Sequence, residues 1–382
     1  MTRKINLPNL AVNTTYSMQI HKPKKKITFK DFYAVDMFCG VGGLTHGLIL
    51  ENIKVKAGFD FDPTCKYAFE KNNKAKFIHK DVTELSASEL LKYFPKGKKK
   101  ILVGCAPCQP FSLYNHKTAK DAKKRKTDSK WKLLYSFSEL IEKVNPEIVS
   151  MENVPMLVKF NKGKVFNDFV SKLRKLGYQV SWEIVNAQDY GVPQRRKRLI
   201  LLASKLGEIV LIDKTVTDKK YKTVREAIGH LPPVEDGISH PDDPLHRARK
   251  LSGLNKKRIQ ATTEGGFWRD WDKSLWLTCH TKDSGKDFNS VYGRMKWDDV
   301  APTMTTHCIG LNNGRFGHPD QDRAITLREA ALIQSFPADY KFINPKASFN
   351  SQNIAKHIGN AVPVGLGIAI AKSIKNHIQE IG

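Results

Sequence analysis

The sequence predicts an α/β fold: a mostly parallel sheet covered by helices on both faces, followed by a second, smaller domain. Between residues 34 and 203, short apolar runs alternate with segments of helical period, which is typical of strands and their covering helices. A cluster of glycines directly follows the first apolar run, where α/β folds often bind ligands. Beyond about residue 212 the alternation fails, and prolines and glycines interrupt a stretch rich in Trp, Arg and His. These three observations together predict the fold class.

Each strand of the main domain is predicted from a short apolar run or from alternation, at 34–38, 53–59, 76–78, 101–105, 147–151, 180–185 and 199–203. Helices are predicted where apolar residues recur at helical spacing, at 44–49, 133–144 and 166–176. Pro146 and Gly177 mark the ends of the last two. Near the end of the chain, Thr326 and Glu329 predict a capping box for a helix through Ile333. The apolar segment 358–374 predicts a core helix.

These elements divide the chain into four parts. Residues 1–30 are polar and basic and predict a loosely docked arm, and residues 31–212 form the main α/β domain. Residues 213–322 form the second domain, and residues 323–382 are helices that return to the first.

The charge of the chain points to a polyanionic partner. The chain has 64 basic and 38 acidic residues among 382, a formal net charge of +26. A charge of this size favours nucleic acid over a small neutral substrate. The alternative is that lysine runs such as 123–126 are solvated loops, or that the lysine excess reflects genome composition.

Composition also predicts the compartment. No apolar stretch approaches membrane-spanning length, and the first residues lack a signal-peptide core. The six cysteines lack the dense, regular spacing of a secreted scaffold. We therefore expect a soluble, cytoplasmic protein with reduced thiols and no membrane partner. Cys105 and Cys108 form a Cys-x-x-Cys pair, but no second pair with ligand spacing follows, so no metal site is predicted.

Gly40, Gly42 and Gly43, which follow the first predicted strand, predict a turn that binds a nucleotide cofactor. Glycines let the backbone approach a ligand, and the following helix presents free amides to it. Asp60 ends the next strand, about where a carboxylate binds ribose hydroxyls. A phosphate-binding Walker loop is excluded, because no Gly-Lys-Ser/Thr follows. The remaining alternative is a tight turn with nothing bound.

Cys108 is a candidate nucleophile. It follows the apolar run 101–105 and stands between Pro107 and Pro110, at the carboxyl end of a predicted central strand. Taken alone, a cysteine in such a position is more often a small core thiol beside a turn. Glu152 follows the next strand and is predicted at the same sheet edge, although a carboxylate there is often only an exposed turn residue.

A basic segment precedes the strand at 199–203. Alternation predicts Arg196 and Arg198 on one face and Lys197 on the other. These side chains could contact a substrate, a phosphate or only solvent.

In their order, these segments resemble the cytosine-C5 methyltransferases of DNA, in particular the bacterial restriction-modification type. The matching segments are 36–43, 104–112, 152–154, 194–198, 328–337 and 359–363. The resemblance covers nearly the whole chain outside the arm and the second domain. It implies a Rossmann-like sheet that uses S-adenosylmethionine, with residues 213–322 as a target recognition domain. It also implies a double-stranded DNA substrate, a monomeric enzyme and functional pairing with a restriction endonuclease.

The resemblance implies a reaction through a covalent adduct. Cys108 would add to C6 of the cytosine, so that C5 can attack the methyl group of S-adenosylmethionine. Glu152 would hold the N3 edge of the base, and Arg196 and Arg198 would orient the base and lower the pKa of the thiol. The target base must leave the duplex and enter the pocket for this chemistry.

The resemblance also assigns binding residues. Phe38 would stack on adenine, Asp60 would bind the ribose and Asn360 would close the pocket. The full predicted cofactor site is Phe38, Gly40, Gly42, Gly43, Asp60, Asp81, Val82, Pro107 and Asn360. Arginine and lysine can read guanine, so the predicted DNA contacts in and beside the second domain are Arg269, Arg294, Lys296, Thr303, Thr305 and Arg315. At least two of the four tryptophans of that domain are expected to build its core.

Two other functions compete with this one. A tRNA cytosine methyltransferase shares the same motifs, but its relatives usually have Thr where Ser112 follows Phe111, and the long second domain suits DNA. A DNA-binding repressor on the same fold would not need Cys108, Glu152 and Arg196. An ordinary dehydrogenase explains neither the cysteine nor the basic excess.

Overall fold

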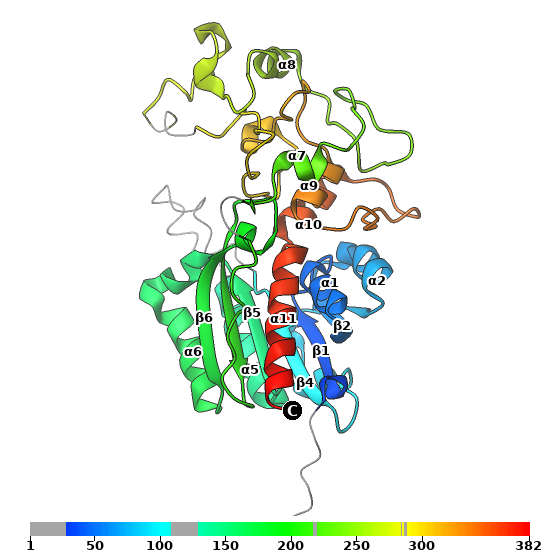
Figure 1. The fold of residues 1–382 in the computed structure, drawn as a ribbon, viewed down its shortest axis with the longest axis vertical. Helices are drawn as coiled ribbons and strands as arrows, with labels where there is room; N and C mark the ends of the chain where they lie inside the picture. The colour runs from blue at the N-terminus through cyan, green and yellow to red at the C-terminus, as the bar shows by residue number, and fades with distance from the viewer. Residues whose placement is uncertain (1–27, 108–128, 217–219, 284, 286–288) are drawn as a thin grey trace, which may run out of the picture.

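The computed structural model describes residues 28–107, 129–216, 220–283, 285 and 289–382 (Figure 1). Cys108 therefore lies outside the described residues. Within them, a seven-stranded sheet has the order β3-β2-β1-β4-β5-β7-β6. Its strands are β1 (Phe32–Met37), β2 (Lys54–Asp60), β3 (Lys76–His79), β4 (Lys99–Gly104), β5 (Ile148–Asn153), β6 (Gln179–Asn186) and β7 (Lys197–Ser204). Strands β1 to β5 pair in parallel, and β7 is antiparallel to both β5 and β6.

Helices cover both faces of this sheet, as the sequence predicts (Figure 1). One face packs against α1 (Gly43–Leu50), α2 (Lys66–Asn73) and α11 (Val364–Glu380), and the other against α3 (Ala87–Leu91), α5 (Leu133–Val144) and α6 (Lys164–Lys175). Neighbouring strand residues divide between the two cores: Ala34 joins the first and Val35 the second. This alternation follows from the period of two along a strand.

The strand order reverses beside β1. The chain runs outward from β1 through β2 to β3, and then returns to place β4 on the other side of β1. In open α/β sheets, ligands bind in the crevice at the carboxyl ends of the strands where the order reverses. The topology therefore places a candidate site at the ends of β1 and β4.

The end of the chain differs from the single core helix predicted at 358–374. The structure contains two helices, α10 (Ser351–Asn360) and α11, and the chain is extended at Ala361 and Pro363 between them. Helix α11 packs closely on α1: a Cβ on Gly47 would lie 2.5 Å from the backbone of Gly367. The break turns α11 back onto the sheet, while the end of α10 stays near the strand edge.

Among the described residues, the helical stretch Ser351–Glu380 is long and apolar enough to cross a membrane by length and composition alone, and 72% of its apolar window is buried inside the protein. The expectation that no apolar stretch approaches membrane-spanning length is therefore wrong. The burial is that of a core helix.

The second domain contains little regular structure. Its described α-helices are α7 (Val224–Ile228) and α8 (Gly253–Gln260), and α9 (Leu327–Ile333) follows it. Its core includes Trp268 and Trp271, which are 2% and 5% exposed, and Trp297 is also buried. The ring of His280 stacks on Trp268 with centroids 4.1 Å apart. The expectation that tryptophans build this core is confirmed.

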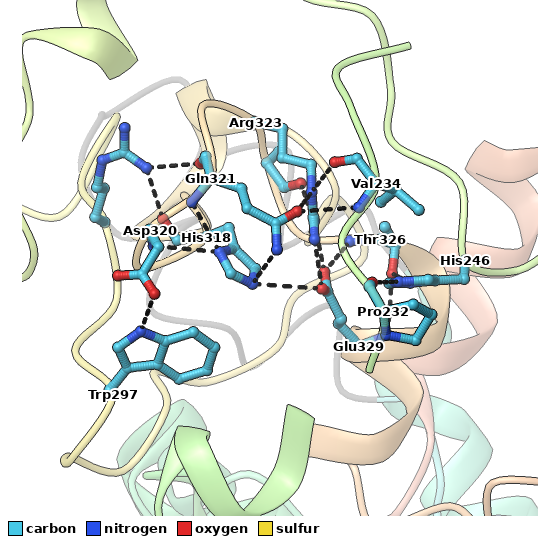
Figure 2. Close-up of polar contacts among 12 residues, drawn as sticks. Pro232, Val234, His246, Trp297, His318, Asp320, Gln321, Arg323, Thr326 and Glu329 are labelled. Carbon is cyan, nitrogen blue, oxygen red and sulfur yellow. Dashed lines mark hydrogen bonds and ion pairs between the residues drawn. The ribbon is translucent and has the colours of Figure 1, made fainter. Parts of the chain in front are cut away.

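A buried polar network connects the second domain to α9 (Figure 2). Thr326 caps α9, and its backbone amide donates to Glu329 at 2.7 Å, so the predicted capping box is confirmed. Arg323 donates to both carboxylate oxygens of Glu329 at 2.7 and 2.8 Å. Although burial opposes ionisation, the Arg323 hydrogen bonds and charge lower the pKa of Glu329 to about 2. His246 bonds Thr326 at 3.0 Å and the carbonyl of Pro232 at 2.8 Å.

Candidate active site

A cavity of about 520 Å³ lies at the carboxyl ends of β1, β2 and β4. This volume suits a cofactor-sized ligand. The structure brings most of the predicted cofactor residues into its lining: Phe38, Gly40, Asp60, Asp81, Val82, Pro107 and Asn360. They come from five separate segments of the chain.

The turn after β1 has a strained backbone. Phe38 has a φ of 61° and Gly40 a φ of 52°. The left-handed region is costly for an aromatic residue and is often retained at functional sites. The Gly40 amide donates to Asp60 Oδ2 at 2.8 Å, and the Asp62 amide donates to Asp60 Oδ1 at 2.8 Å. Both oxygens of Asp60 are therefore held at the cavity wall.

A second carboxyl group, Asp36, also lines the cavity. It is 1% exposed, and burial raises its pKa to about 7, although the Thr45 hydroxyl donates to it at 2.6 Å and favours the ionised form. Burial likewise raises the pKa of Asp60. A cationic ligand would favour ionisation of both groups and be stabilised by them. The sequence motif contains Asp36, but only its burial beside the cavity identifies it as a site residue.

Gly42 and Gly43 do not line this cavity. A Cβ on Gly42 would lie 2.4 Å from the Asn73 side chain, and one on Gly43 would lie 2.2 Å from the carbonyl oxygen of Val362. These glycines let α1 approach α2 and the α10–α11 break. Packing accounts for both glycines, and their prediction as cofactor-binding residues stays a prediction.

The cavity also contains residues that sequence reasoning missed. Phe61 lines it and is 71% exposed, so a ligand lying against its ring would bury apolar surface. Thr83 lines it too, and its backbone amide and hydroxyl both donate to Asp81 at 2.8 Å. In the sequence, Phe61 could have been identified by its position directly after Asp60, the residue predicted to bind the ribose.

One group of possible metal ligands borders the cavity. Among the described residues, ligand atoms of Asp62, Cys65 and His357 lie within 4.8 Å of one another. However, the Lys356 ammonium lies 2.9 Å from Asp62, and burial raises the pKa of the Cys65 thiol. A bound cation would have to displace the lysine and deprotonate the thiol. We assign no metal to this group.

Glu152 and Arg198 meet beside the cavity. Glu152 is the residue before the last of β5 and is 2% exposed, and Arg198 Nε, from β7, lies 2.8 Å from its Oε1. Cys105 Sγ donates to Oε2 at 2.7 Å. The Cys-x-x-Cys pattern gave no indication of this contact, which was not predicted from the sequence. Cys105 lies beyond the last residue of β4, so strand alternation does not set the direction of its side chain.

Asn153 ties the segment before Cys108 to the same edge. Its side-chain amide donates to the carbonyl of Ala106 at 3.0 Å, and Asn153 is 1% exposed. Pro107 follows and lines the cavity. The two residues that precede Cys108 are therefore held at the cavity wall and at the end of β5.

Arg196 lies in the protein interior. It is 3% exposed and donates to the carbonyl oxygens of Met304 at 2.9 Å and Gly359 at 3.0 Å. These bonds join the segment before β7 to the second domain and to the end of α10. These contacts give Arg196 a role in positioning the segments that it joins, and its predicted orientation of the base stays a prediction.

A second cavity, of about 500 Å³, lies where the second domain meets the segment before β7. It gathers the predicted DNA contacts Lys296, Thr303 and Arg315 and adds Arg195. Lys296 and Thr303 are exposed, and the Thr303 hydroxyl donates to the Arg195 carbonyl at 2.5 Å. Arg315 is half-buried and donates to the carbonyl of Gly266 at 2.9 Å.

The other predicted DNA contacts divide by burial. Arg269 is exposed over the Trp268 ring, and Thr305 is half-buried. Arg294 is 4% exposed and donates to Thr262 at 2.6 Å, Ile259 at 2.8 Å and His318 at 2.9 Å, all through backbone carbonyls. The interior position of Arg294 contradicts the predicted DNA contact, because its guanidinium is hydrogen-bonded to backbone carbonyls within the second domain.

Several known proteins are similar to this chain over most of its length. The family model described as C-5 cytosine-specific DNA methylase matches residues 32–376. The chain is 52% identical to the Type II methylase M.HgiDII of Herpetosiphon aurantiacus, over 90% of this chain and 95% of that protein. It is 29% identical to the Type II methyltransferase M1.HphI of Haemophilus parahaemolyticus, over 89% of this chain and 86% of that protein.

Solved structures have the same fold. A DNA modification methyltransferase encoded within an E. coli prophage has a TM-score of 0.68 at 20% identity, covering 91% of this chain and 99% of that one. The Entamoeba histolytica methyltransferase EhMeth has a TM-score of 0.63 at 16% identity, covering 93% and 99%. The fold, the motifs and the matched length agree on the enzyme class and on S-adenosylmethionine as cofactor. The chain therefore belongs to the C-5 cytosine-specific DNA methylase family.

Proposed function

We propose that this protein methylates C5 of a cytosine within a specific double-stranded DNA sequence, through addition of Cys108 to C6 of a flipped-out base. The observation that carries the proposal is the Glu152–Arg198 pair, held at the strand edge beside the cofactor cavity. Directly before the segment that contains Cys108, Ala106 is bonded to Asn153, the neighbour of Glu152, and Pro107 lines the cavity. A cofactor in the cavity and a base held by Glu152 could therefore approach each other near Pro107.

The cavity residues suit S-adenosylmethionine, which supplies an electrophilic methyl group on a sulfonium. Asp60 would accept the ribose hydroxyls, and the raised-pKa carboxyl of Asp36 would stabilise the positive charge of the ligand. Phe38, Phe61 and Asn360 also line the cavity, and the two apolar rings could pack against the adenine. Asp81 and Val82 would border the adenine edge.

Glu152 would hold the N3 edge of the base. Its carboxylate can accept from the amino group of cytosine, and a proton shared with N3 would draw electron density from C6. Arg198 keeps the charge of Glu152 balanced at 2.8 Å in a site from which water is largely excluded. The Cys108 thiolate would then meet a more electrophilic C6.

The second domain would contact the DNA. Lys296 and Thr303 are exposed at the 500 Å³ cavity, and Arg195 lies beside them, so a phosphate could bind there. Arg269 is also exposed and could reach a base edge. We place the catalytic domain at 31–212, the target recognition domain at 213–322 and the returning helices at 323–382. We further propose a cytoplasmic monomer that is paired functionally with a restriction endonuclease.

Replacing Asp60 with Asn should weaken binding of S-adenosylmethionine by about 10- to 100-fold. An amide cannot accept from both the Gly40 and Asp62 amides, so one N–H would face another donor. Isothermal titration with the cofactor measures the effect. The control is Asp298→Asn, because Asp298 pairs with Arg225 on an exposed surface away from the cavity. Equal affinity in the Asp60 variant and the wild type would contradict the assignment.

The proposed reaction is tested by labelling and sequencing. Purified protein with methyl-labelled S-adenosylmethionine should transfer label to duplex DNA and not to tRNA. The Cys108→Ser protein is the negative control. Bisulfite sequencing of DNA from expressing cells should show 5-methylcytosine at one recurring sequence. Label in tRNA alone would favour the tRNA methyltransferase, and sequence-specific binding without label would favour the repressor.

A further inference from the structure

The Glu152 carboxylate is held from both sides within the sheet. Strand β5, which carries Glu152, lies between β4 and β7. Arg198 approaches Oε1 from β7, and Cys105 approaches Oε2 from the end of β4. The two contacts therefore come from opposite neighbours of the same strand.

The second contact restricts a motion that the first leaves open. The terminal torsion of a glutamate side chain has a broad energy minimum, so an ion pair to one oxygen permits the carboxylate plane to rotate. A hydrogen bond to the other oxygen fixes that plane. Cys105 can hold this position because its own amide donates to the carbonyl of Met37, at the end of β1, at 3.2 Å.

Cys105 also belongs to the wall of the cofactor cavity. The same residue thus touches the space for the methyl donor and the carboxylate proposed to hold the base. Its thiol is a neutral donor, so it orients Glu152 without placing a further charge between the two sites.

We propose that Cys105 is a positioning residue whose thiol hydrogen bond fixes the Glu152 carboxylate in the orientation that receives the cytosine. The inference rests on the proposed function of Glu152. It assigns the first cysteine of the Cys-x-x-Cys pair a role distinct from that of Cys108.

Two variants, Cys105→Ala and Cys105→Ser, distinguish a hydrogen-bond donor at this position from a side chain that only fills space. Alanine removes the donor, whereas serine keeps a hydroxyl that can donate to Glu152. We expect Cys105→Ala to lower kcat about 10-fold with KM for S-adenosylmethionine within about twofold of wild type, and Cys105→Ser to restore most of kcat. A residue that only fills apolar space would give the opposite order, because the serine hydroxyl is harder to bury than a methyl group.

Matched measurements make the outcome decisive. Cys308→Ala removes a buried thiol from the region of the second domain and should leave kcat unchanged. Thermal unfolding of each variant shows whether it folds. Wild-type kcat in Cys105→Ala, or a serine variant no better than alanine, overturns the inference. Glu152→Gln tests the underlying assignment: full activity there refutes the proposed function of Glu152, whereas an inactive Glu152→Gln beside a fully active Cys105→Ala refutes only the role of Cys105.

Discussion

Replacing Cys108 with Ser should abolish methyl transfer and leave sequence-specific DNA binding intact. A serine hydroxyl is not ionised near neutral pH and cannot replace a thiolate nucleophile. Loss of a covalent nucleophile typically lowers kcat by about 10³-fold or more. Transfer of labelled methyl groups to a duplex containing the target site measures kcat, and a filter or gel-shift titration measures binding.

Trapping with 5-fluorocytosine distinguishes a missing nucleophile from a disordered site. Fluorine at C5 cannot be removed as a cation, so the wild-type enzyme should remain covalently attached to such DNA. The Cys108→Ser protein should form no adduct. The control is Cys279→Ser, because Cys279 is an exposed cysteine that does not line the cofactor cavity. An adduct that survives in Cys108→Ser would show that another residue attacks the base.

Replacing Arg323 with Met should lower the free energy of unfolding by about 3–5 kcal/mol, the usual cost of leaving one partner of a buried ion pair unpaired. Arg323 and Glu329 are each 1% exposed, and the guanidinium also donates to the Val234 carbonyl at 3.0 Å. Urea denaturation measures the change. The control is Arg225→Met, because its ion pair with Asp298 is exposed to solvent and should contribute little to stability.

The cost of the Arg323 substitution should depend on pH. The pKa of Glu329 is lowered from 4.5 to about 2, so its ionised form stabilises the fold above about pH 4.5, and this contribution is lost as the pH falls toward 2. Without Arg323, the buried carboxyl can be accommodated by protonation. The difference in unfolding free energy between wild type and variant should therefore be largest at neutral pH and shrink below about pH 4.5. A difference that is constant from pH 7 to pH 3 is incompatible with this ion pair.

Local pattern was enough to predict the sheet and the cofactor turn. Alternation and short apolar runs located the strands, because a strand buried on both faces must be apolar along its length. The left-handed turn at Gly40 and the carboxylate of Asp60 were readable because they follow strands directly. The capping box of α9 was also local, since Thr326 and Glu329 are three residues apart.

Only the tertiary structure could decide which polar groups face a ligand and which are used inside the protein. Arg196 and Arg294 have the sequence character of substrate-binding residues, yet backbone carbonyls far along the chain accept their hydrogen bonds. Gly42 and Gly43 share a motif with Gly40, but neighbouring helices occupy the space beside them. Cys105 gained Glu152 as a partner because β4 and β5 are adjacent in the sheet. Period and spacing along the chain report burial and strand ends, whereas the partner of a polar side chain depends on segments that only folding brings together.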